Sequence, residues 1–342
     1  MRHSPPALLL LLALGAGSCI AHASAGRHVT FENDRFYDTD RYYTNGIQLS
    51  LTRAGGDKPG WARWACREFG CADAAVQHSV HNLGQIMYTP VVISEPQPQP
   101  FDRPWAGLLY YERGYTLVAP DQKTLTTLTW LAGVTGPASL AEQSQKLVHR
   151  VMDIPPPQGW HNQVGGTLGL MATVEKRRAF EALSADWSSG MQLRSAVYWR
   201  LALGNVMTHA GAGIAVALGR DLPLVVGSPS GIQNKARAVP ALDAACLLKW
   251  LRCTTFASAE VRAVAYNVFL DGRIGRDDPE VDSRPFVGET SVGMRLDLPR
   301  SRSASHGPWF LQLKVTRRSR EFRSARPVYS HTFGSISAGV DW

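Results

Sequence analysis

The sequence of 342 residues has no long hydrophobic segment, few cysteines and little charge, and each shortage excludes a class of protein. Its longest apolar run, residues 7–16, is too short for a polytopic helical membrane protein, which needs several stretches of about 18 residues. Five cysteines are too few for a disulfide scaffold, and 44% hydrophobic with 19% charged residues excludes a disordered chain. An ordinary soluble protein or a transmembrane β-barrel remains, because a barrel alternates apolar and polar residues and so averages to a soluble composition.

The N-terminus predicts export from the cytoplasm. Arg2 precedes the apolar run, and residues 21–25 offer two small-x-small cleavage sites, as in a secretory signal peptide. Cleavage after Ala25 divides the chain into a signal peptide, residues 1–25, and a mature domain, residues 26–342. An exported protein meets an oxidising compartment, where cysteines that are close in sequence can form local disulfides. The two candidate pairs are Cys66/Cys71 and Cys246/Cys253.

Apolar residues recur at every second position along most of the mature domain, and this period predicts β-strands. In residues 288–298, for example, Val292, Met294 and Leu296 alternate with glycine and charged residues. The uncharged segment 201–219 favours a strand over a transmembrane helix, because it contains several glycines and keeps the same alternation. The expected strands span residues 27–34, 43–52, 79–89, 104–118, 123–135, 164–176, 191–203, 206–219, 254–268, 288–298, 309–316 and 335–342.

The last of these segments alternates up to Trp342, and a terminal strand that ends on an aromatic residue is typical of outer-membrane barrels. The alternative is the closing strand of a soluble β-sandwich. About twelve strands of roughly ten residues make an even number that fits the mature domain. We therefore predict an all-β fold, a transmembrane antiparallel β-barrel of about twelve strands in the outer membrane of a Gram-negative bacterium.

One segment departs from the alternation. Ser139 and Glu142 have the spacing of a capping box, and apolar residues then recur at helical spacing up to Met152. The prolines at 155–157 end the pattern. We predict a short amphipathic helix over residues 140–152. Because barrels of this kind start and end in the periplasm, strand parity places the helix in an extracellular loop.

Polar residues at this extracellular rim are the candidates for chemistry, since the sequence has no Gly-x-Ser-x-Gly elbow, Walker loop or His-Glu-x-x-His run. Asn33 and Asp34 end the first strand, Thr44 opens the second, and His149 lies on the helix, one turn from Gln145. Each also has a purely structural interpretation: an Asn-Asp turn, an ordinary strand residue and a solvated helix residue.

A series of short runs extends over nearly the whole mature domain. They are Phe31-Glu32-Asn33-Asp34-Arg35-Phe36, Tyr43-Thr44-Asn45-Gly46, Met87-Tyr88-Thr89-Pro90, Asp102-Arg103-Pro104-Trp105-Ala106-Gly107, Gly136-Pro137, His149-Arg150, Gln158-Gly159-Trp160-His161-Asn162-Gln163, Asn267-Val268-Phe269-Leu270-Asp271-Gly272, Pro285-Phe286-Val287-Gly288 and Arg320-Glu321-Phe322. In this order they resemble the outer-membrane lipid A 3′-O-deacylases, the LpxR-like proteins. Each run is short, but the ordered set is specific.

The resemblance implies a twelve-stranded barrel that hydrolyses the ester of the 3′-acyloxyacyl group of lipid A in the outer leaflet, with Ca²⁺ as cofactor. The family's essential Asn-Asp pair falls on Asn33 and Asp34, its threonine on Thr44 and its histidine on His149.

Two positions depart from the family. A lysine found after the Tyr-Ser/Thr-Pro run has no counterpart, because residues 91–101 contain no lysine. A glutamate that is suspected to help hold Ca²⁺ falls at Pro155, and Asp153 is the nearest substitute. The expected metal ligands are therefore Asp34, Thr44 and Asp153.

The excess of 36 Lys and Arg over 28 Asp and Glu suits a phosphorylated lipid if the cations gather at the rim. Taken singly, each cation is better explained as a solvated charge. The candidate substrate-binding residues are Arg103, Arg150 and Gln145, with Arg35 and Arg41 as further rim cations. The expected partners are lipopolysaccharide, outer-membrane lipid and the barrel assembly machinery. We expect a monomer that binds no nucleic acid.

In the mechanism that these residues suggest, His149 acts as the general base for a water molecule, and Ca²⁺ polarises the ester carbonyl. Asn33 donates to the oxyanion and Thr44 orients His149 or the metal. Two alternatives remain open: a non-enzymatic porin or adhesin, and an outer-membrane phospholipase with a Ser–His pair. The available serines are Ser50, Ser139 and Ser144.

Overall fold

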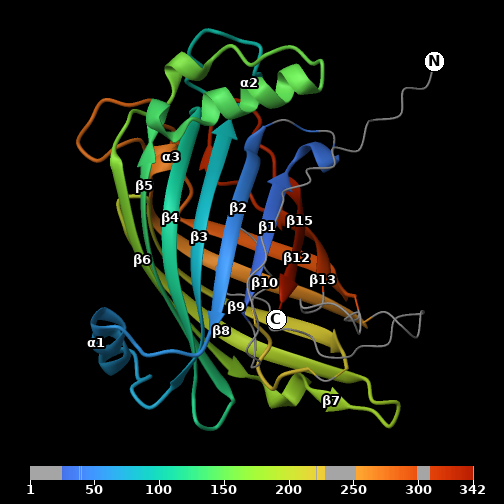
Figure 1. Ribbon diagram of the computed structural model, residues 1–342. Helices are drawn as coiled ribbons and strands as arrows, with labels where there is room; N and C mark the ends of the chain where they lie inside the picture. The colour runs from blue at the N-terminus through green and yellow to red at the C-terminus, as the bar shows by residue number, and fades with distance from the viewer. Residues whose placement is uncertain are drawn as a thin grey trace, which may run out of the picture.

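The protein is a closed barrel of antiparallel strands (Figure 1), seen in a computed structural model that describes residues 25–37, 39, 41–220, 222–227, 252–298 and 309–341. Within these residues twelve long strands surround the lumen, and the ring closes through the β1–β15 and β6–β8 pairs. The strands are β1 (Gly26–Asn33), β2 (Tyr42–Ala54), β3 (Ala75–Thr89), β4 (Ala106–Val118), β5 (Thr124–Thr135), β6 (Leu168–Ala179), β8 (Gln192–Gly204), β9 (Met207–Gly219), β10 (Arg252–Asn267), β12 (Phe286–Asp297), β13 (Trp309–Arg318) and β15 (His331–Asp341).

The predicted barrel is confirmed, and each predicted strand overlaps an observed one. Strand β6 begins at Leu168, whereas it was expected to begin at residue 164. Val164 is instead buried at the mouth of the barrel and donates a hydrogen bond to the Trp105 carbonyl at 2.8 Å. Residues 1–24, Cys246 and Trp342 lie outside the described residues, so the signal peptide and the pair Cys246/Cys253 stay predictions. The disulfide between Cys66 and Cys71 is present.

Side chains alternate between the lumen and the outer wall. On β12, Glu289 and Arg295 are buried inside, whereas Val292 and Met294 point outward and are exposed. The other strands repeat this arrangement, with exposed outward residues that include Val29, Leu49, Leu83, Val197, Leu201, Val261 and Leu311. An apolar outer wall around a polar interior is what a lipid-facing barrel requires.

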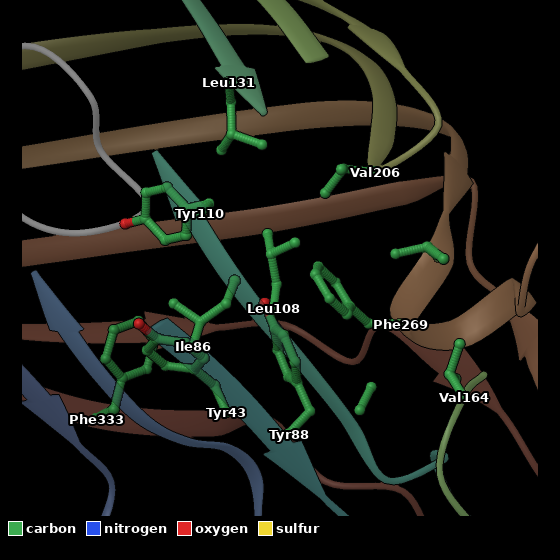
Figure 2. Packing of buried hydrophobic residues seen from close by; sticks show 12 residues of the cluster. Tyr43, Ile86, Tyr88, Leu108, Tyr110, Leu131, Val164, Val206, Phe269 and Phe333 are labelled. Atoms are coloured by element: carbon green, nitrogen blue, oxygen red, sulfur yellow. The ribbon is translucent and has the colours of Figure 1, made fainter. Parts of the chain in front are cut away.

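Two apolar clusters fill the lumen towards its ends. We call the end where Gly26 pairs with Asp341 the terminal end, and the opposite end the loop end. The loop-end cluster, shown in Figure 2, contains Tyr43, Ile86, Tyr88, Leu108, Tyr110, Leu131, Val164, Val206, Phe269 and Phe333. The terminal-end cluster contains Leu125, Tyr198 and Phe256, together with Leu222, Val225 and Val226 from the chain after β9.

A ladder of alternating arginines and glutamates crosses the lumen between neighbouring strands. Its members, in spatial order, are Arg177, Glu175, Arg200, Glu260, Arg262, Glu289, Arg318, Glu321 and Arg103. Arg262 and Arg318 both reach Glu289, at 2.9 and 2.8 Å. All these side chains are largely buried, and a buried charge is tolerated only when it is paired.

Helices α1 (Gly60–Glu68), which follows β2, and α2 (Ala141–Val151), which follows β5, lie outside this barrel (Figure 1). The single turn α3 (Val268–Asp271) follows β10 and packs Val268 and Phe269 into the loop-end cluster. The shorter elements are η1 (Arg35–Tyr37), η2 (Gly136–Ser139), η3 (Trp160–Asn162), η4 (Glu181–Leu183), β7 (Ala185–Asp186), β11 (Asp282–Ser283) and β14 (Phe322–Arg323). None of the helices in the described part of the chain combines the length and the apolar character needed to cross a membrane.

Helix α2 confirms the predicted helix, but the predicted capping box is wrong. The N-cap is Leu140, which has a left-handed backbone with φ of 58°. The Ser139 hydroxyl donates to the Gly136 carbonyl at 2.6 Å, and Glu142 pairs with Lys146 one turn later. The Ser139 side chain is therefore bonded within the turn Gly136–Ser139 and does not cap the helix.

Replacing Glu289 by alanine tests the ladder. The change leaves Arg262 and Arg318 buried without their shared carboxylate, so we expect the free energy of unfolding to fall by roughly 3–5 kcal/mol. The measurement is urea unfolding followed by heat-modifiable gel mobility. Glu181→Ala, which removes an exposed carboxylate paired with Lys123, should change little. Equal effects of the two substitutions would show that lumen water replaces the lost partner.

Candidate functional site

Helix α2 packs on the outer wall of the barrel at the loop end, across β3 and β4 (Figure 1). Outward-facing Met87 of β3 is buried in a cluster with Ala141 of α2, Trp105 and Trp160. Gly107 of β4 permits this approach, because a β-carbon there would lie 2.4 Å from the Ala141 β-carbon and from the Ser139 hydroxyl. The helix is therefore seated on the wall with no room for a side chain beneath it.

Helix α2 buries two polar side chains and exposes an apolar stripe. Gln145 and His149 are buried against the barrel. The exposed apolar stripe consists of Leu140, Leu147, Val148, Val151 and Met152. The wall under α2 offers polar partners: the Gln85 amide, for example, donates to the Ser139 carbonyl at 2.6 Å. The polar side of the helix therefore faces inward.

A narrow cleft separates α2 from the ends of β1, β2 and β3. Its lining consists of Asn33, Arg35, Thr44, Asn45, Met87, Ser144, Gln145, Val148, His149 and Ile154. His149 is 4% exposed, and its Nδ1 lies 2.6 Å from the Pro155 carbonyl oxygen. A carbonyl oxygen only accepts, so Nδ1 carries a proton, and in the neutral tautomer that fits this contact the lone pair lies on Nε2.

Asn33 and Asp34 form the turn that leaves β1, and they face different surroundings. The Asn33 Oδ1 accepts a hydrogen bond from the Arg35 backbone N–H at 2.7 Å, and this side chain lines the cleft. The Asp34 side chain is fully buried, and its Oδ2 accepts from the Thr39 hydroxyl at 2.9 Å and from the Arg41 N–H at 2.7 Å. Asp34 therefore organises the loop behind the cleft and is not among the lining residues.

Thr44 is the extra residue of a β-bulge. The pairing between β2 and β3 shifts between Tyr43 and Asn45, so Thr44 has no partner in the ladder. A bulge re-aims a side chain, and bulges are frequent beside active sites. The Thr44 hydroxyl is hydrogen-bonded to the Thr89 hydroxyl at 2.7 Å and lines the cleft. The structure thus brings Asn33, Thr44, Gln145 and His149 to one cleft.

The comparisons with known proteins bear on this site. Over residues 7–342 the sequence matches the family described as outer membrane protein LpxR. The chain belongs to the LpxR family. A search of curated proteins finds no match.

Solved structures support the same fold. The LpxR of Salmonella typhimurium superposes with a TM-score of 0.71 at 19% sequence identity, over 93% of this chain and 100% of that one. The β domain of the Bordetella autotransporter BrkA matches with a TM-score of 0.43 at 9% identity, over 94% of this chain and 100% of that one. Only the first is similar enough to support the LpxR fold.

The ligands that the resemblance to LpxR implies for Ca²⁺ do not meet in the cleft. Asp34 is buried behind it, and Asp153 is exposed after α2 with φ of 54°. Thr44, Asn33 and Ser144 supply neutral oxygens. Among the described residues no group of three or more His, Cys, Asp or Glu converges. Since Ca²⁺ takes six to eight oxygens, usually with carboxylates, these residues do not form a calcium site by themselves.

The predicted substrate-binding residues are also dispersed. The Gln145 Oε1 accepts from the Trp160 indole N–H at 2.7 Å and lines the cleft. Arg150 is exposed on α2, outside the lining. Arg103 was placed at an exposed rim, but it is 1% exposed, pairs with Glu321 at 3.2 Å and lies 4.1 Å above the Tyr88 ring.

Arg103 is buried because it pairs with Glu321, which in turn pairs with Arg318 of the ladder. Its neighbour Asp102 is half-buried and accepts hydrogen bonds from the Val91 and Arg103 backbone N–H groups. Burial raises the pKa of the Asp102 carboxyl above its usual value. This loop is therefore folded onto the barrel mouth and presents little charge to the outside.

Sequence reasoning missed Met87, Asn45, Ile154 and Trp160. Met87, Asn45 and Trp160 lie inside runs that carried the resemblance, and that was the available signal. Trp160 is 1% exposed and its ring centroid lies 5.0 Å from that of Trp105, so it supports α2 from below. The alternation of strands says nothing about which loops fold back onto the wall.

Replacing Trp160 by phenylalanine tests this support. The change keeps the ring and removes the hydrogen bond to Gln145, which costs about 1 kcal/mol locally. We expect amide hydrogen exchange in α2 to accelerate several-fold while the strands keep their protection. Trp187→Phe, at an exposed tryptophan between β7 and β8, is the matched control. Unchanged exchange in α2 would mean that the apolar contacts alone hold the helix.

Proposed function

We propose that this protein is an outer-membrane hydrolase that removes the ester-linked 3′-acyloxyacyl group from lipid A. Membership of the LpxR family supports a lipid A deacylase of the outer membrane. The observation that carries the reaction is the Nδ1 contact of His149 with the Pro155 carbonyl, in a cleft on the outer side of the barrel wall. A lipid reaches such a cleft from the membrane without entering the lumen.

His149 is the general base in this proposal. The Pro155 carbonyl keeps the proton on Nδ1, so Nε2 takes a proton from water as the water oxygen attacks the ester carbonyl. The carbonyl π-bond electrons move onto oxygen and form a tetrahedral oxyanion. When this collapses, the C–O bond to the sugar breaks and Nε2 returns the proton to the leaving sugar oxygen. The products are a free fatty acid and a 3′-hydroxyl.

In this proposal Asn33 stabilises the oxyanion, and Thr44 helps to position the groups of the cleft. Because the Asn33 Oδ1 already accepts from Arg35, its amide N–H₂ is the group that remains to donate to an oxyanion. Thr44 is held by Thr89 at the end of β2 and is a positioning residue. Arg35, which also lines the cleft, supplies a cation for a phosphate of lipid A.

The exposed face of α2 suits acyl chains. Val148 belongs both to the cleft lining and to the apolar stripe that runs from Leu140 to Met152. A fatty chain can lie along this stripe while its ester reaches His149. The loop end then faces the cell exterior, where lipid A is found, and the terminal end faces the periplasm. We also propose that the barrel assembly machinery inserts the protein into the outer membrane and that the protein is a monomer.

No step of the mechanism runs through Ca²⁺, because the described donors do not complete a calcium site. The resemblance to LpxR remains the support for the cofactor. Calcium would polarise the ester carbonyl when bound.

Changing His149 to alanine should abolish acyl release, measured by mass spectrometry of lipid A from an expressing strain, because nothing else in the cleft takes over as base. A general base typically contributes 10²–10⁴-fold, so we expect a loss of about that size. His161→Ala, at an exposed histidine of the same loop, is the control for general perturbation. Release at the wild-type rate from the His149 variant would contradict its role.

Two further results separate the alternatives. Ser144 lies in the same cleft, so Ser144→Ala should keep full activity if water is the nucleophile. Loss of activity in that variant, with labelling of the wild type by a fluorophosphonate, would support a Ser–His phospholipase. If the folded wild-type barrel leaves lipid A intact, a non-enzymatic barrel becomes the better description.

Chelation by EGTA tests the calcium that the resemblance to LpxR implies: if Ca²⁺ is the cofactor, EGTA stops the release of the acyl group and added Ca²⁺ restores it. The described residues complete no calcium site by themselves, and on that basis EGTA has no effect. The assay is again lipid A mass spectrometry, with purified protein in detergent. Full activity in EGTA would remove calcium from the proposal and leave the His149 mechanism intact.

A further inference from the structure

Helix α1 covers part of the outer wall near the terminal end of the barrel (Figure 1). Leu117 of β4, Leu128 of β5 and Val174 of β6 point outward, on the side that is exposed elsewhere on these strands. All three are buried, with Leu117 at 0% exposure, because Ala62, Ala65 and Cys66 of α1 pack against them. The helix thus takes a place that lipid occupies around most of the wall.

The helix is fixed there by several independent links. The disulfide Cys66–Cys71 closes the turn that follows it. Lys176, from the neighbouring strand β6, donates to the Phe69 carbonyl at 3.1 Å and to the Gly70 carbonyl at 3.3 Å. The Trp61 ring lies 5.6 Å from that of Tyr115 on β4. These links hold α1 in one orientation against the wall, so its free face is a fixed surface.

The free face of α1 carries Arg63, Trp64 and Arg67, all exposed, with Trp64 at 58%. Arg63 and Arg67 lie one turn apart, and Trp64 lies between them. Within the helix itself Glu68 is the acidic residue, and the Arg63 guanidinium also donates to the Lys58 carbonyl at 2.7 Å. Tryptophan is enriched at membrane–water interfaces, and arginine near the surface attracts anionic lipid headgroups.

We propose that this face of α1 binds an anionic phospholipid, with the phosphate held by Arg63 and Arg67 and the Trp64 ring at the level of the glycerol esters. A lipid fits better than a protein, because α1 lies directly on the lipid-facing wall and headgroups surround it on that side. The bound lipid fixes the depth of the barrel in the membrane. The inference rests on the proposed function only in naming the leaflet as the periplasmic one.

The test uses the purified, folded full-length chain in nanodiscs with equal amounts of phosphatidylglycerol and phosphatidylethanolamine. Native mass spectrometry after release from the disc counts the lipids that stay bound. We expect retained phosphatidylglycerol in excess, and a fall of about fivefold in each of Arg63→Gln and Arg67→Gln, since one arginine near an anionic surface contributes that much. Arg27→Gln, at an exposed arginine of β1 near the terminal end, should retain the wild-type amount.

Two results would overturn the proposal. One is unchanged phosphatidylglycerol in both α1 variants, which is also the result expected if this face binds a protein. The other is an equal loss in Arg27→Gln, which would show only a general charge effect. Trp64→Ala supplies the second measurement: brominated lipid should quench less of the total tryptophan fluorescence than in wild type. Lipid A release is measured in parallel, and its failure would affect the proposed reaction but not this site.

Discussion

The closed ring of strands is the constraint on which the rest of the molecule depends. Every long strand in the described part of the chain is paired on both sides, with β1 and β15 closing one junction. Closure sends alternate side chains inward, so the charged ones must find partners there, and the ladder around Glu289 is the result. A lumen filled in this way leaves the outer wall as the surface on which chemistry with lipids can take place.

Two helices use that wall in opposite ways. Helix α1 sets small apolar residues such as Ala62 and Ala65 against it and turns its charges outward. Helix α2 sets Gln145 and His149 against it and turns its apolar stripe outward. The first arrangement covers the wall, and the second leaves a cleft beside the exposed apolar stripe. In the proposed function, this places a polar reacting group next to a surface that suits a fatty chain.

The alternation in the sequence was enough to predict the barrel, because the pleat itself has a period of two. The helix after β5 was also predictable, but not its orientation. Its apolar stripe is exposed, while Gln145 and His149 face the wall, where groups such as the Trp160 indole N–H offer polar partners. The bulge that carries Thr44 depends on the pairing of two strands, and a single strand pattern does not contain it. Arg103 was misplaced because its partner Glu321 lies far along the chain.

Gly107 has a consequence for how the cleft can change. The contact between this glycine and α2 leaves no space for one further carbon atom. The position of α2 on the wall, and with it the width of the cleft, therefore depends on Gly107, which is not among the lining residues. A larger residue there would push α2 away from the wall and so separate His149 from Asn33 without changing any residue of the proposed site. The proposed site thus depends on a residue that adds only a hydrogen atom to the contact.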